Sequence, residues 1–142
     1  MNDVRNVLAG FWGSYVNRGA SLPALPTGAV IPAFAEGYVP KEHKNTWPRI
    51  TYQLALPSFL DSTILTASIW DRRAAFPGFF GLIDDVLEQA RGKIPEGGTI
   101  LKCGSGAIWL LRSTPFIDFL DDPDDQSITR GIIRTVVRSH VF

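Results

Sequence analysis

Residues 127–142 read SITRGIIRTVVRSHVF, and the alternation in this stretch decides the fold class. Successive side chains of a β-strand point to opposite faces, so residues two apart share a face. One face of the predicted strand carries a row of arginines spaced four residues apart: Arg130, Arg134 and Arg138. The other face carries apolar side chains that we expect to pack on helices: Ile133, Val137 and Val141. The stretch therefore predicts a long strand with one buried face and one polar face.

The chain before this strand predicts further strands and helices. Runs of alternating or β-branched residues indicate strands at residues 50–56, 63–70, 99–102 and 107–112. Apolar residues at helical spacing indicate helices at residues 3–17 and 78–91. Strands grouped in hairpins with helices between the groups are typical of an α+β fold. We therefore expect a mostly antiparallel sheet of about five strands with two helices packed on one face, within a core formed by residues 49–142.

Residues 19–48 predict a long Pro-rich arm rather than a regular element. Five prolines interrupt this segment, and each one fixes a backbone dihedral and removes a hydrogen-bond donor. Apolar residues such as Leu25, Ile31 and Phe34 recur in it, whereas a free linker would be polar. The arm therefore either lies across its own domain or is covered by another chain. At 142 residues, the chain has the usual size of a single domain.

Composition argues against several classes of function. The chain has 14 Lys and Arg against 14 Asp and Glu, and this zero net charge disfavours a protein that coats nucleic acid. The single cysteine excludes an internal disulfide and a multi-cysteine zinc site. No run approaches the roughly 18 apolar residues of a membrane span, so we expect no membrane association. The glycines at 97–98 and 104–106 lack the spacing of a nucleotide-binding loop, so we expect no cofactor.

Residues that could act in catalysis are few. Cys103 stands beside Lys102, whose charge favours a thiolate, but His43 and His140 lie far from it in the sequence. An inert cysteine at a strand end is the better interpretation of this pattern. A small cytoplasmic enzyme that uses Cys103 or His140 remains an alternative.

An acidic stretch precedes the last strand, with five aspartates within eight residues: Asp118, Asp121, Asp122, Asp124 and Asp125. Carboxylates bind hard cations, but this stretch lacks the central glycine and the distal glutamate of a calcium loop. We therefore expect no metal here, and a loop over residues 118–125 that faces solvent or a partner. If this loop and the arginine row lie on opposite flanks, the aspartates of one copy can meet the arginines of the next. Such a head-to-tail contact forms a ring when its rotation closes.

Residues 47–54 read WPRITYQL, and residues 115–122 read PFIDFLDD. The first segment resembles the strand P-x-I-T-Y-x-L of tail terminator proteins from tailed bacteriophages and prophages. The second is similar to a P-F-I-x-F element with trailing acidic residues in the same family. A second strand, a helix, a short glycine-bounded strand and a long final strand follow in the family's order. The resemblance covers residues 31–142 and depends on the order and spacing of these short motifs.

The resemblance implies a structural protein of virion assembly and no enzymatic activity. Proteins of this family are expected to assemble in the host cytoplasm and to form a hexameric ring in the virion, at the head-proximal end of the tail. The ring stops growth of the tail tube protein, offers a docking surface to the head connector, and lets genomic DNA pass through its lumen without specific binding. The five aspartates and three arginines are then candidates for the ring interface or the lumen. A head-side connector or neck ring protein is the nearest alternative, and a nucleic-acid-binding module is a further one.

Overall fold

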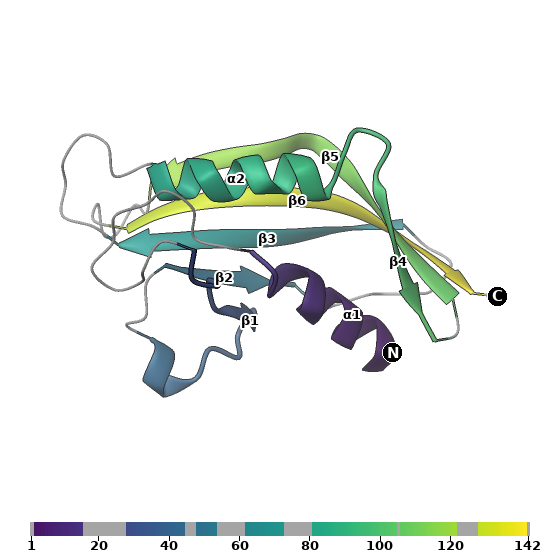
Figure 1. Cartoon of the computed structure of the whole chain (residues 1–142), viewed down its shortest axis with the longest axis horizontal. Coiled ribbons are helices and arrows are strands. Elements are labelled where there is room, and N and C mark those ends of the chain that lie inside the picture. The colour runs from purple at the N-terminus through teal and green to yellow at the C-terminus, as the bar shows by residue number, and fades with distance from the viewer. Residues whose placement is uncertain are drawn as a thin grey trace.

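The protein is built on a single curled sheet of six strands, in the order β1-β2-β3-β6-β5-β4 (Figure 1). The computed structural model describes residues 2–15, 28–44, 48–53, 62–72, 81–104, 106–121 and 128–141. The strands are β1 (Ala33–Ala35), β2 (Arg49–Tyr52), β3 (Ser62–Arg72), β4 (Thr99–Cys103), β5 (Gly106–Asp121) and β6 (Ile128–Val141). The helices are α1 (Asn2–Trp12), α2 (Gly81–Lys93) and the short 3-10 helix η1 (Lys41–His43). The first two strands are parallel, and all other neighbouring strands are antiparallel.

The long alternating strand lies at the centre of the sheet, as β6. It pairs along its length with β3, from Ile128↔Arg72 to Arg138↔Ser62, and with β5 on its other side. Its odd-numbered residues face the helices, and Ile133 and Val137 are buried there. The helix α2 comes so close that a Cβ at Gly131 would lie 2.8 Å from Ile83 Cγ2. The predicted division of this strand into a helix-covered face and an arginine face is confirmed.

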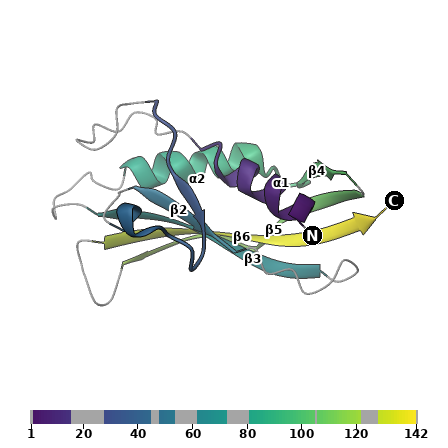
Figure 2. The same cartoon turned by 90° about the horizontal axis from the view of Figure 1, so that it is seen from below.

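Both α-helices lie on the same face of the sheet, as expected (Figure 2). The helix α2 packs on the central strands β3 and β6, whereas α1 contacts both edge strands, β1 and β4. A sheet whose two edges reach one helix must curl around it, so the core lies inside the curl. The buried side chains of the helices form their apolar stripes: Leu8 and Trp12 of α1, and Ile83, Val86, Leu87 and Ala90 of α2.

The helices and most strands lie where the sequence predicts them, with shifted ends. The first helix ends at Trp12 rather than at residue 17, because Gly13 has a low helix propensity and Ser14 Oγ donates to Phe11 O at 2.7 Å, closing the last turn. The second helix runs over 81–93 rather than 78–91. Residues 16–17, 54–56 and 78–80 of the predicted elements lie outside the described residues.

The expectation of an irregular arm is not confirmed for residues 28–44, where Ala33–Ala35 and Lys41–His43 form regular elements. Within that range, β1 adds a sixth strand to the sheet, with Ala33 paired to Ile50, and Ile31 beside it is fully buried in the core. The short helix η1 follows, and Arg49 of β2 donates from its guanidinium NH1 to the carbonyl oxygen of Lys44 at 2.7 Å. This part of the arm therefore lies against its own sheet. The rest of the predicted arm, residues 19–27 and 45–47, lies outside the described residues.

The prediction that the acidic stretch begins as a loop at Asp118 is wrong as well. β5 continues to Asp121 through an irregularity, because Arg112 pairs with Thr135 and Ile117 pairs with Ile133. Residues 113–116 therefore stand opposite Arg134 alone, which reverses the alternation of the strand. One of them is a proline, which cannot donate a ladder hydrogen bond. The sequence pattern breaks at this point, although the strand does not.

Candidate functional site

The face of the sheet turned away from the helices is the candidate functional surface. Figure 2 shows α1 and α2 on one side of the sheet, so the even-numbered side chains of β6 point to the other side. Side chains that pair directly across an antiparallel sheet share a face. The outer face is therefore made of the even-numbered residues of β6 and the residues paired with them on β3 and β5.

Arg130 is held on the outer face by side chains of neighbouring strands. Its guanidinium carbon lies 4.6 Å from the centroid of the Trp70 ring, and its Nε donates to Ser68 Oγ at 2.9 Å. The Trp70 indole in turn donates to Thr51 Oγ1 at 2.8 Å. This chain of contacts joins β6, β3 and β2, and it covers Ser68 and Thr51, which are both buried. The guanidinium of Arg130 is therefore bound by side chains of its own chain, and it stabilises the sheet there.

Arg134 forms an ion pair within the chain. Its NH1 lies 3.0 Å from Asp118 Oδ2 across the β5–β6 pair, and both side chains are partly exposed. A partly exposed pair of this kind contributes at most about 1 kcal/mol. One member of the acidic stretch therefore meets one member of the arginine row, but within one copy of the protein. An Asp118–Arg134 contact between two copies would have to replace this internal pair.

Arg138 lies at the other end of the row, within an apolar patch. The patch consists of Ile64 of β3, Ile100 of β4, Trp109 and Leu111 of β5, and Val136 of β6. The pairs Ile100↔Trp109, Trp109↔Arg138, Leu111↔Val136 and Val136↔Ile64 make these side chains neighbours on the outer face. Ile100 is 64% exposed, Ile64 is 59% exposed and Trp109 is 40% exposed. Contiguous apolar side chains of this size on a surface are typical of an interaction site.

Trp109 has a fixed orientation within the apolar patch. Its indole nitrogen donates to the carbonyl oxygen of Gly97 at 3.2 Å, in the turn that leads from α2 to β4. The positive φ of 81° at Gly98 and the close approach of the Trp109 ring leave no room there for a Cβ. A tryptophan whose ring is already ordered loses little side-chain entropy on binding a partner.

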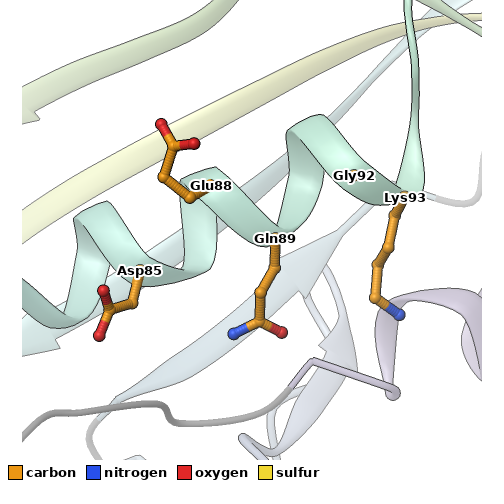
Figure 3. A pocket seen from close by; sticks show the side chains of 5 residues that line it. All are labelled: Asp85, Glu88, Gln89, Gly92 and Lys93. Atoms are coloured by element: carbon orange, nitrogen blue, oxygen red, sulfur yellow. The ribbon is translucent and has the colours of Figure 1, made fainter.

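The opposite side of the molecule carries a polar cavity of about 370 Å³ on the outward face of α2. Figure 3 shows the residues that line it: Asp85, Glu88, Gln89, Gly92 and Lys93. The side chains of Asp85, Gln89 and Lys93 lie on one flank of the helix, and that of Glu88 lies on the other. Glu88 pairs with Arg91 at 3.2 Å on the exposed helix surface. This surface combines carboxylates with an open hollow.

Lys93 connects the end of α2 to the end of α1. Its ammonium group hydrogen-bonds to Ser14 Oγ and lies 4.8 Å from the centroid of the Tyr15 ring. Burial lowers the pKa of Lys93, and burial raises the pKa of Tyr15 far above its ordinary value. The Tyr15 hydroxyl is buried and has no hydrogen-bond partner among the described residues. These groups hold the ends of α1 and α2 together, so their role in the structure is to pack the two helices.

The residues considered for catalysis are not brought into a common site by the described part of the structure. Cys103 packs against the margin of the core, with Sγ 3.9 Å from Leu101 O, on edge strand β4. His43 lies in η1 beside the opposite edge strand, with its ring 5.0 Å from that of Phe34. The side chain of His140 lies outside the described residues. Within the described ranges, no three His, Cys, Asp or Glu side chains gather closely enough to hold a metal ion.

The predicted site residues are thus divided among different surroundings. Arg130 and Arg134 have partners within the chain, and Arg138 is exposed among apolar side chains. The side chains of four aspartates lie outside the described residues: Asp121, Asp122, Asp124 and Asp125. The sequence analysis missed the apolar patch, although one local signal pointed to it. Trp109 alternates with Ile108 and Leu110, so one face of that predicted strand had to expose a tryptophan if the other was buried.

The sequence matches no protein-family model and no curated protein. Neither α-helix of the described chain is long and apolar enough to cross a membrane.

Proposed function

We propose that this chain is a structural protein that assembles with copies of itself and ends a phage tail tube, as the tail terminators that it resembles do. In this proposal it forms a ring at the head-proximal end of the tail, built from copies in head-to-tail contact and hexameric as the resemblance implies. The ring stops growth of the tube protein and receives the head connector, and genomic DNA passes through it without specific binding. The protein then acts in the virion, carries out no catalysis and needs no cofactor.

The observation that carries the proposal is the apolar patch on the outer face of the sheet. Ile100 and Trp109 expose large apolar surfaces side by side, next to an exposed arginine. Leu111 and Val136 connect them to Ile64 on the same face. Tryptophan and arginine are the residues most enriched at the energetic centres of protein interfaces. A protein partner is therefore the ligand class that this surface fits best. The order of the strands and helices along residues 31–142 is the second support, because it agrees with the resemblance.

The first experiment is negative-stain imaging of the concentrated protein, with native mass spectrometry on the same sample. We expect a closed ring of copies around a central hole, either in the free protein or after addition of isolated tail tubes. Discrete dimers without rings, together with no binding to tail tubes, would overturn the proposal. A ring that binds portal complexes and leaves tail tubes uncapped would instead favour the neck-protein alternative.

A matched pair of variants tests whether the apolar patch matters. Ile64 in the patch and Val30 outside the sheet's outer face are 59% and 58% exposed, so an aspartate at either position should leave folding intact. We expect Ile64→Asp to abolish assembly and Val30→Asp to retain it. Equal assembly by both variants would separate the patch from the function.

A further inference from the structure

The apolar patch and the polar cavity lie on opposite sides of the molecule. The patch belongs to the face of the sheet opposite the two helices, which Figure 2 shows on one side of the sheet. The cavity is lined by residues on the side of α2 away from its buried side chains (Figure 3). A contact between these two unlike surfaces is heterologous, because it leaves a free cavity on one copy and a free patch on the other. Such contacts continue from copy to copy until they close.

The outer face carries exposed cations, and the cavity side carries carboxylates that could pair with them. Arg138 and Lys102 are exposed on the outer face, where Lys102 follows Ile100 by two residues on β4. The cavity side offers Asp85, which is partly exposed, and Glu88, whose side chain is 73% exposed. Arginine binds carboxylates through two parallel hydrogen bonds, which gives such contacts direction as well as energy.

Glu88 pairs with Arg91 at 3.2 Å within the chain, so Arg138 of a second copy would have to share or replace that contact. Lys93 also lines the cavity, but its ammonium group is hydrogen-bonded to Ser14.

The two surfaces further agree in shape. The cavity of about 370 Å³ is open at Gly92, where a Cβ would meet no atom within 4 Å. Trp109 stands next to Arg138 on the neighbouring strand, with its ring partly exposed and its orientation fixed by Gly97. An ordered aromatic side chain beside an arginine is the kind of anchor that fills a hollow in a partner.

We propose that the apolar patch of one copy docks onto the outward face of α2 of a second copy, with Arg138 placed between Asp85 and Glu88 and Trp109 over Gly92. This inference depends on the proposed self-assembly and names its interface. It also assigns the roles within the arginine row. Arg130 and Arg134 stabilise the sheet of their own chain, and Arg138 reaches the next copy.

Charge exchange tests the contact directly. Arg138→Glu and Glu88→Arg should each weaken self-association on the order of tenfold or more, because each places like charges together. The double variant restores opposite charges and should recover part of the association, measured by sedimentation velocity over a range of concentrations. Lys41→Glu is the matched control, because Lys41 is exposed in η1 and away from both surfaces, and we expect it to assemble normally.

Cross-linking distinguishes this contact from a patch-to-patch dimer. In a Cys103→Ser background, the pair Arg138→Cys and Glu88→Cys should give a ladder of covalent oligomers with a short thiol cross-linker, and neither single cysteine should. A covalent dimer from Arg138→Cys alone would overturn the heterologous contact in favour of a symmetric one.

The outcomes also separate this inference from the proposed function. A wild-type ring that persists unchanged in Arg138→Glu overturns the interface and leaves the proposed function standing. A wild-type chain that stays monomeric, both alone and with tail tubes, overturns both. Loss of association in both single variants with recovery in the double variant supports the interface.

Discussion

The buried hydroxyl of Tyr15 gives a quantitative test of how the two helices meet. The Tyr15 ring is fully buried and stacks on Trp12 with centroids 5.8 Å apart, but its hydroxyl meets no hydrogen-bond partner within the described part of the chain. A buried polar group without a partner costs about 1–3 kcal/mol. Tyr15→Phe keeps the ring and removes that group. We therefore expect the variant to be more stable than the wild type by about 1–3 kcal/mol at neutral pH.

The same substitution should change the response to alkaline pH. Burial raises the pKa of Tyr15, so the folded protein keeps the phenol neutral where the unfolded chain ionises it. The stability that depends on the neutral phenol is fully present below pH of about 10 and is lost above it, by up to about 1.4 kcal/mol per pH unit. Burial lowers the pKa of Lys93, and this has the opposite effect on stability. Between the lowered pKa and the ordinary pKa of lysine, the free energy of unfolding rises with pH, and above the ordinary pKa this rise stops. Lys93 is present in both proteins, so their difference reports Tyr15 together with any effect of its phenol on the neighbouring Lys93.

Urea denaturation followed by circular dichroism, at neutral pH and at several values near pH 10, measures both effects. Tyr38→Phe is the control, because Tyr38 is 79% exposed and should change neither quantity. The reasoning is refuted if Tyr15→Phe lowers the free energy of unfolding, since the hydroxyl would then have a stabilising partner. Parallel pH curves for wild type and variant would likewise show that burial does not hold the phenol neutral.

Gly131→Ala would place a methyl group 2.8 Å from a side-chain atom of α2, so we expect a loss of about 1–3 kcal/mol in urea denaturation. An unchanged denaturation midpoint would contradict this close approach. Asp118→Asn removes the partner of Arg134 from a partly exposed pair, so the loss should be at most about 1 kcal/mol and should shrink as salt is added; a salt-independent loss would count against it. Arg134→Glu should weaken self-association through the distorted outer face, and sedimentation that matches the wild type would remove Arg134 from any role in assembly. Cys103→Ser should be nearly silent in thermal melting, and the loss of an activity would favour the enzyme alternative.

The central strands and the helices could be predicted because their signals are local. Alternation over 127–142 and helical spacing over 78–91 appear directly in the sequence, and both patterns survive in the fold. The strand β1 could not be predicted in this way, since Ala33–Ala35 is short, follows a proline and pairs in parallel with a distant segment. The continuation of β5 beyond residue 112 could not be predicted, because residues 113–116 shift the alternation of buried and exposed side chains. A strand whose alternation shifts in this way resembles a loop in the sequence.

The arginine row could be predicted as a row, but the surroundings of each arginine could not. Those depend on the register between strands that lie far apart in the sequence: Arg130 bonds to Ser68, 62 residues before it. The apolar patch depends in the same way on β4, β5, β6 and β3 meeting side by side. Local sequence therefore identifies the residues of a sheet surface, and register decides which of them remain available to a partner.

The pairing of β3 with β6 also bears on the biosynthesis of the protein. These strands form the middle of the sheet, yet the ribosome makes residues 62–72 well before residues 128–141. Until β6 emerges, the nascent chain holds β2, β3 and α2 with their apolar faces incompletely covered, and contacts between such distant segments form slowly. Chains shortened before β6 should therefore bind chaperones and accumulate in inclusion bodies. Any fragment designed for expression needs to retain this strand.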